Sequence, residues 1–203
     1  MEEHASNGGE LDELVRRTEG LQPWRRWFHF AGGLCVAWLV YTLSPQSSTT
    51  RWIFGSILAV TLLGDFVRLR AEAANRMVFR TFRVLLRPHE VDTPSLSWYM
   101  LGVFLVLWVP DPTVVVPALL VLAVADPAAG LVGETWGTHA LGKGTVQGSL
   151  TFFVAALAVL MPFAGVLAAL TVGAVATVAE VARTPLDDNL VIPVITALAL
   201  WAF

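Results

Sequence analysis

Apolar residues fall in seven runs along the chain, and short polar segments separate the runs. They span residues 28–43, 52–67, 96–109, 114–125, 150–162, 165–182 and 190–203. About 20 helical residues cross a bilayer core, and shorter runs can cross where the flanking side chains snorkel. The run at 114–125 is short enough to be a re-entrant or buried segment instead. The pattern predicts an all-α polytopic membrane bundle of about seven transmembrane helices.

The basic residues are unevenly distributed between the two predicted sides of the membrane. Of the 13 Lys and Arg residues, all but Arg51 fall in segments on one side. Because cytoplasmic segments are enriched in Lys and Arg, we expect the N-terminus inside and the C-terminus outside. The segments at 68–95, 126–149 and 183–189, which carry most of the ionisable groups, then face the cytoplasm.

Composition supports one membrane-embedded domain at residues 23–203. The chain is 56% hydrophobic and 14% charged, with a mean hydropathy of +0.66, which excludes an ordinary soluble domain. Residues 1–22 are polar and lack the apolar core of a signal peptide, so we expect a polar N-terminal tail. We expect the lipid bilayer as a partner and no nucleic acid.

A basic amphipathic helix is predicted between the second and third apolar runs. Its arginines recur at intervals of four, three and four and share one helix face ahead of Pro88: Arg76, Arg80, Arg83 and Arg87. Such a helix lies in the membrane interface, with its basic face toward lipid phosphates or a soluble polyphosphate. The alternative is a topology signal that merely holds anionic headgroups.

The most specific stretch covers residues 125–149. Asp126 followed by Pro127 predicts the start of a new helix, with an N-cap and a proline at the first helical position. Three small residues at intervals of four give this helix a nearly bare face: Ala129, Gly133 and Gly137. A bare face permits close approach of another helix or of a flat nucleotide.

A phosphate cradle is predicted directly after this segment. One cation, two hydroxyls and two flexible glycines lie ahead of a helix start, where free backbone N–H groups favour an anion: Lys143, Gly144, Thr145, Gly148 and Ser149. The spacing of a Walker A loop is absent. Asp126 and Glu134 are ionisable groups at a membrane edge, where such groups are costly and mark function.

Two further polar clusters lie at the predicted cytoplasmic edge. Glu180, Asp188 and Asn189 offer hard oxygen ligands that suit Mg²⁺ shared with substrate phosphates, although Asp188 or Asn189 can instead cap the last helix. Asp65 and Arg68 have the spacing of an i,i+3 ion pair.

Four segments resemble the polyprenol kinase group of membrane proteins, which comprises dolichol kinases, phytol kinases and CTP-dependent diacylglycerol kinases. RRWFHFAGG (25–33) resembles the Arg-Lys-x-x-His motif before the family's first span, and DPAAGLVGETWG (126–137) resembles its Asp-x-x-Ala segment. GKGTVQGS (142–149) resembles its Lys-[Ser/Thr]-x-Glu-Gly-Ser loop, and EVARTPLDDNLVIP (180–193) its Glu and Asp-Asn before the last span. Gly144 and Gln147 depart from the family's lysine and glutamate.

The resemblance implies transfer of a γ-phosphoryl group, typically from CTP, to the hydroxyl of a membrane lipid alcohol, either an isoprenoid alcohol or diacylglycerol. Phosphoryl transfer depends on positioning, on cations over the phosphates and on a bridging metal. The residues expected to contact the nucleotide are Gly133, Gly137, Lys143, Thr145, Gly148, Ser149 and Arg68. Those expected to hold Mg²⁺ are Asp126, Glu180, Asp188 and Asn189. We expect catalytic roles for Asp126, Lys143, Asp188, Arg26 and His29.

Two role assignments stay open at this point. Arg25, Arg26 or Arg68 can offset the charge that develops in transfer, and His29, Asp65 or Glu180 can orient the acceptor hydroxyl. Two other functions also remain: a CTP:phosphatidate cytidylyltransferase-like enzyme, and a transporter or non-catalytic membrane scaffold. A transporter places its polar residues near the middle of the bilayer, whereas here they gather at one face.

Overall fold

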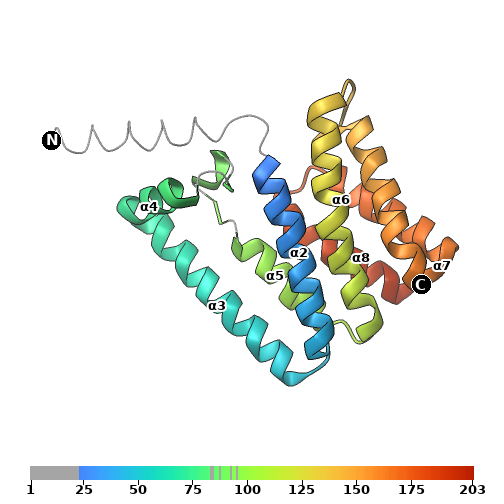
Figure 1. Ribbon diagram of the computed structural model, residues 1–203, viewed down its shortest axis with the longest axis horizontal. Helices are drawn as coiled ribbons and strands as arrows, with labels where there is room; N and C mark the ends of the chain where they lie inside the picture. The colour runs from blue at the N-terminus through green and yellow to red at the C-terminus, as the bar shows by residue number, and fades with distance from the viewer. Residues whose placement is uncertain (1–22, 83–84, 87, 92, 95) are drawn as a thin grey trace.

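The computed structural model describes residues 23–203 except 83–84, 87, 92 and 95, and these residues form an all-helical protein (Figure 1). The all-α prediction is confirmed. The longer helices are α2 (Pro23–Leu43), α3 (Ser48–Arg70), α4 (Glu72–Phe82), α5 (Leu96–Val106), α6 (Val115–Trp136), α7 (Val146–Val181) and α8 (Asp188–Ala202). Short 3₁₀ turns, η1 (Pro88–Val91) and η2 (Pro112–Val114), and a small hairpin, β1 (Ala140–Leu141) with β2 (Gly144–Thr145), complete the described part.

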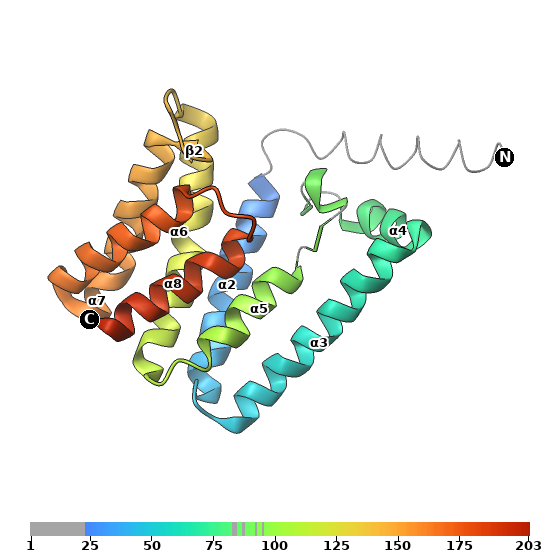
Figure 2. The ribbon, with the colours of Figure 1, turned by 180° about the vertical axis from the view of Figure 1, so that it is seen from behind.

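Helix α6 lies at the centre of the fold and packs against α2, α7 and α8. Helix α5 packs against α8 and α3, so α3 reaches the rest of the molecule mainly through α5 (Figure 2). One apolar cluster joins α2, α3, α5, α6 and α8, and a second joins α6, α7 and α8. Close approach of α2 and α6 requires a glycine, because a Cβ at Gly33 would lie 2.5 Å from the Ala123 Cβ.

Three helical stretches in the described ranges are long and apolar enough to cross a membrane: Ser48–Arg70, Pro112–Trp136 and Val146–Val181. Helices α5 and α8 are apolar but shorter. Many large apolar side chains point outward; Trp52 is 77% exposed and Leu167 is 69% exposed. Burying such side chains in lipid avoids the cost of hydrating them. Seven transmembrane helices and their orientation remain predictions.

Helix α7 contains two of the predicted spans, 150–162 and 165–182. Gly165 has φ 78° and ψ 173°, a conformation open only to glycine, and it divides α7 into two arms. The arms fold back on each other: Phe152, Ala156 and Leu160 of the first share a buried cluster with Ala169, Val172 and Ala176 of the second. The fold-back returns Val181 to the start of α7, where its carbonyl accepts a bond of 3.2 Å from the Lys143 N–H.

The predicted helix start at Asp126 is wrong, because α6 runs through Asp126 and Pro127 without a break. A proline inside a helix loses one backbone bond and strains the preceding turn. Here Ala125, Pro127 and Ala129 are all buried, so packing of α6 against its neighbours offsets that loss. Asp126 therefore lies on the side of a continuous helix rather than at a cap.

The predicted basic helix is present as α4, which ends at Phe82 rather than near Pro88. On α4 Arg80 is exposed and Arg76 is half-buried. Arg83, Arg87 and the tail at 1–22 lie outside the described residues.

Candidate functional site

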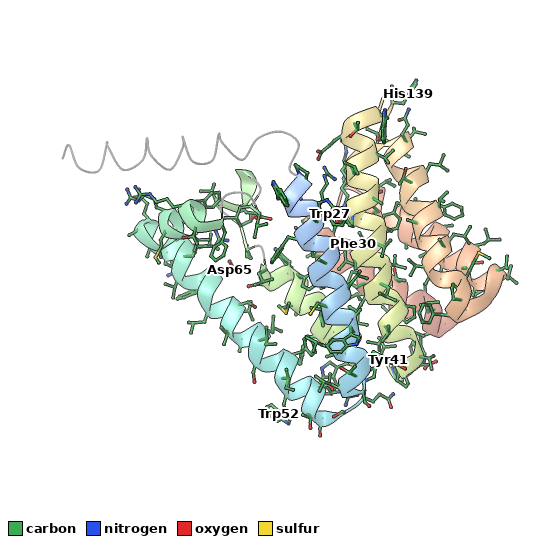
Figure 3. The ribbon with its side chains drawn as sticks, in the orientation of Figure 1. Trp27, Phe30, Tyr41, Trp52, Asp65 and His139 are labelled. Carbon is green, nitrogen blue, oxygen red and sulfur yellow. The ribbon has the colours of Figure 1, made fainter. Side chains whose placement is uncertain are left out.

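The polar residues of five segments gather at one end of the molecule. The N-terminus of α2, the C-terminal half of α6, the β hairpin, the end of α7 and the start of α8 all lie there (Figures 1 and 2). Figure 3 shows His139 at this end, whereas Tyr41 and Trp52 lie at the opposite end. We call the following residues the polar cluster: Arg26, His29, Asp126, Glu134, Lys143, Ser149, Glu180 and Asp188.

Arg26 joins the start of α2 to the C-terminal half of α6. Its guanidinium forms an ion pair with Glu134, and its Nη1 donates to the Pro127 carbonyl over 3.5 Å. Between these two contacts the guanidinium lies across Gly130, where a Cβ would overlap Nη1. The Arg26 side chain is 12% exposed, so the fold holds a cation in a sheltered position against α6.

His29 lies one turn after Arg26 and faces Asp126. Its Nε2 is 3.6 Å from Asp126 Oδ2, an ion-pair distance when the imidazole is protonated. The ring also meets Tyr99 of α5 edge-on, with centroids 5.8 Å apart. A carboxylate beside a histidine orients the imidazole ring. The sequence analysis did not identify Tyr99, because an aromatic residue within an apolar run is expected to be a core residue.

The β hairpin places Lys143 on the start of α8. Gly142 and Lys143 form its two-residue turn, and Gly142 has φ 59°. Arg183 donates to the Gly142 carbonyl from Nε at 3.2 Å and from Nη2 at 3.0 Å. Held in this way, the Lys143 ammonium forms an ion pair with Asp188 Oδ1. Sequence reasoning missed Arg183, although it is the one basic residue in the segment before α8.

Three acidic groups of the polar cluster, Asp126, Glu180 and Asp188, lie close enough to one another to interact electrostatically. Glu180 interacts with Asp188, Lys143 and Asp126, and Asp188 interacts with Lys143 and Asp126. Ser149 Oγ donates to Glu180 over 3.5 Å. The structure thus brings the loop before α7, the end of α7 and the start of α8 together around Lys143.

The capping prediction for α8 is off by one residue. Asp187 is the N-cap, and its side chain accepts a bond of 2.9 Å from the Asn189 N–H. The Asp188 side chain is therefore left to pair with Lys143. The backbone carbonyl of Asn189 packs against Gly102 of α5, where a Cβ would overlap it.

The polar cluster offers carboxylate oxygens that suit a magnesium ion, but too few of them to hold the ion without other ligands. Carboxylate and amide oxygens are the ligands that Mg²⁺ prefers, and it usually takes one or two protein carboxylates together with substrate phosphates. Within the described residues, no group of three or more His, Cys, Asp or Glu side chains is arranged to hold a metal ion. Asp126 and Asp188 therefore fit a metal that the nucleotide brings with it better than one held by protein alone.

The bare face of α6 packs against the start of α7. A Cβ at Gly133 would lie 3.0 Å from Thr145 Oγ1, and one at Gly148 would lie 3.0 Å from the Ala129 carbonyl. Gly137 also faces Thr145. Thr145 is the N-cap of α7, since its hydroxyl accepts from the Gly148 N–H at 3.2 Å. The sequence left open whether this face approaches another helix or a nucleotide, and in the structure it packs against the start of α7.

Arg68 belongs to a separate buried polar group, and the structure does not bring it to the polar cluster. It is 5% exposed. Its guanidinium donates to Asp65 Oδ1 at 3.0 Å, Asn75 Oδ1 at 3.0 Å, the Glu90 carbonyl at 2.6 Å and the Thr93 carbonyl at 2.6 Å. Asp65 also accepts from Ser97 Oγ at 2.6 Å. The i,i+3 pair is real, and we assign Arg68 to joining α3, α4 and α5 rather than to nucleotide contact.

Gln147, which departs from the family pattern, supports the hairpin. Its Oε1 accepts from the Thr138 N–H at 3.1 Å, and its Nε2 donates to Thr138 Oγ1 at 2.6 Å. Gly144, the other departure, lies beside Glu180, with room for a Cβ 3.6 Å from Oε1.

The fold and the polar cluster together define an all-helical protein with apolar helices and a charged site at one end. The chain is similar to CTP-dependent diacylglycerol kinase 1 of Schizosaccharomyces pombe, with 32% identity over 162 residues that cover 68% of this chain and 73% of the relative. It is also similar to an uncharacterized protein of Rickettsia prowazekii, with 28% identity over 137 residues and 66% of each chain covered.

The chain belongs to the family of CTP-dependent lipid kinases, and with its apolar helices it is a membrane protein. This finding confirms part of the resemblance but does not extend to polyprenol kinases specifically. No protein-family model matches the chain. No solved structure matches it.

Proposed function

We propose that the chain transfers the γ-phosphoryl group of CTP to the hydroxyl of a membrane lipid alcohol, with diacylglycerol as the first substrate to test and isoprenoid alcohols as the second. The observation that carries the proposal is the meeting of Lys143 with Asp188, within electrostatic reach of Asp126 and Glu180. A cation surrounded by hard oxygen donors is the arrangement that a metal-bound triphosphate needs.

In this proposal the ion pairs of the free protein exchange for contacts with the nucleotide. Lys143 would contact the phosphates instead of Asp188, and Asp188 and Asp126 would hold Mg²⁺ with support from Glu180 and Asn189. When bound, the ion neutralises charge on the transferred phosphoryl group. Thr145 and Ser149 lie at the start of α7, where the backbone N–H groups favour an anion.

Side chains of α2 are suited to the reacting end of the nucleotide. Arg26 is sheltered beside α6 and offsets the developing charge, with Arg25 next to it in sequence. His29 is the best candidate to orient the acceptor hydroxyl, because it faces Asp126. Asp65, by contrast, is engaged with Arg68 and Ser97.

The test is a radiolabel assay on the purified protein in detergent, with γ-labelled CTP and ATP against diacylglycerol, phytol and a polyprenol as kinase acceptors, and against phosphatidate as the cytidylyltransferase substrate. We expect a labelled lipid monophosphate and CDP. Release of pyrophosphate with formation of a CDP-lipid would instead establish a cytidylyltransferase, and no transfer to any acceptor would favour a transporter or scaffold.

Asp126→Asn and Lys143→Ala should each lower turnover by about 10²-fold or more, as expected when a group that stabilises transition-state charge is lost. Asp111→Asn is the matched control. It makes the same chemical change at the other end of α6, where Asp111 Oδ1 accepts from Thr113, and it should leave turnover unchanged. Near-normal turnover in both site variants would refute the site assignment.

A further inference from the structure

The outer face of α4 is a basic surface that the proposed chemistry does not use. An open hollow there is lined by Ala73, Arg76, Met77, Arg80 and Thr81. These positions follow the three- and four-residue spacing of one helix face. Met77, between the two arginines, is 70% exposed.

The opposite face of α4 is fixed to the protein. Phe79 is fully buried, and Asn75 accepts from Arg68 at 3.0 Å while its amide donates to the Val91 carbonyl at 2.8 Å. The outer face therefore keeps a constant direction relative to α3 and η1.

Helix α4 begins where a candidate membrane span ends. Helix α3 runs to Arg70, and Ala71 caps it by donating to the Val67 carbonyl. The Asn75 N–H then bonds the Ala71 carbonyl at 3.0 Å, so α4 starts with no intervening loop. Figure 1 shows α4 turning sharply at the end of α3 and running back toward η1. With α3 across the bilayer, α4 lies at the level of the lipid headgroups.

We propose that the outer face of α4 binds the phosphate groups of anionic lipids in the bilayer surface. Arg76 and Arg80 supply the positive charge, with stems that reach along the helix as their guanidinium groups stay at headgroup level. Met77 reaches into the upper part of the acyl chains between them. This surface lies apart from the polar cluster and does not depend on the kinase proposal.

The experiment measures which lipid lies next to α4 in nanodiscs. A fluorophore is attached to Thr81→Cys, at the rim of the hollow, in a Cys35→Ser background because Cys35 is exposed. The discs contain spin-labelled phosphatidylglycerol or spin-labelled phosphatidylcholine at the same mole fraction. We expect several-fold stronger quenching by the anionic lipid.

Each arginine near an anionic surface contributes about 1 kcal/mol, which is about fivefold in association. Arg76→Gln and Arg80→Gln should each reduce the preference by roughly this factor, and the double variant should remove it. Arg51→Gln, which removes one positive charge from the opposite end of α3, should not change it.

Raising NaCl to about 1 M, where the Debye length is about 3 Å, should weaken the preference in the labelled protein that keeps both arginines. The salt measurement does not depend on whether any arginine variant folds. Equal quenching by the two lipids, or a preference that survives both substitutions, would overturn the proposal. So would a response to soluble tripolyphosphate in phosphatidylcholine discs without any lipid preference.

Discussion

Gly130 allows the Arg26 guanidinium to lie against α6. Because Gly130 has no Cβ, the Arg26 side chain can cross α6 at this position and reach Glu134. A larger residue there would meet the far end of a flexible side chain, which can move at little cost to folding. A larger residue at position 130 should therefore move Arg26 without much change in the free energy of unfolding.

Gly130→Ala should displace the Arg26 guanidinium and lower turnover by about tenfold or more, since a misplacement of about 1 Å can cost about 10²-fold. The melting temperature in detergent should change little. Gly32→Ala is the matched control on α2, because no atom lies within 4 Å of a Cβ at that position. Equal turnover in the two variants would show that the position of Arg26 is not needed for transfer.

At the residue scale, the sequence predicts which polar residues gather in the polar cluster better than it predicts the contact that each one makes. Residue type and polarity alone place Lys143, Asp188 and Glu180 at one end. Spacing alone cannot distinguish Asp187 from Asp188 as the cap of α8, because the difference depends on which carboxylate Lys143 reaches. The burial of Arg68 depends on residues 22 and 25 positions later, Glu90 and Thr93, which no local pattern reveals.

At the scale of elements, the β hairpin is the piece that carries Lys143 to its partner. Only two backbone pairs hold the strands together, so the hairpin depends on its contacts with the end of α7 and with the segment that follows α7. The bond from the Lys143 N–H to Val181 and the two bonds from Arg183 to Gly142 supply these contacts. Arg183 is therefore a positioning residue for Lys143.

Arg183→Gln should raise the KM for CTP about fivefold, the equivalent of about 1 kcal/mol for a lost hydrogen bond, with a smaller change in kcat. Arg183→Lys should recover part of the effect, since one donor can still reach the Gly142 carbonyl. Gly144→Ala, which has space for a methyl group in the same hairpin, serves as the control. A loss of kcat with an unchanged KM would contradict a positioning role.

Local patterns predict the helices well except at α6. Asp126-Pro127 has the local form of a helix start, and burial on several sides overrides it. Gly165 separates two predicted spans that are indeed two arms of α7. Long-range packing thus overrides the local breaker at Pro127, whereas the glycine conformation at Gly165 ends the first arm of α7.

At the scale of the whole molecule, the distribution of basic residues predicts which end of the fold faces the cytoplasm. The connection between α2 and α3 and the segment before α8 lie at opposite ends in Figure 2. Thr49 and Thr184 are exposed at these two ends.

Thr49→Cys and Thr184→Cys, each in a Cys35→Ser background, should react with a membrane-impermeant maleimide from opposite sides of sealed vesicles. We expect the Thr184→Cys variant to be labelled from the cytoplasmic side and the Thr49→Cys variant from the other, as the positive-inside rule requires. Labelling of both variants from one side would contradict the proposed topology, and permeabilised vesicles report whether each thiol is reactive at all.

The reversal at Gly165 also bears on how the protein is made. Lys143 gains its neighbours Val181 and Asp188 only after some forty further residues have been synthesised and the second arm has returned beside the first. Until then a nascent chain carries Lys143 without these two neighbours, so the proposed nucleotide site is complete only after Asp188 has been synthesised.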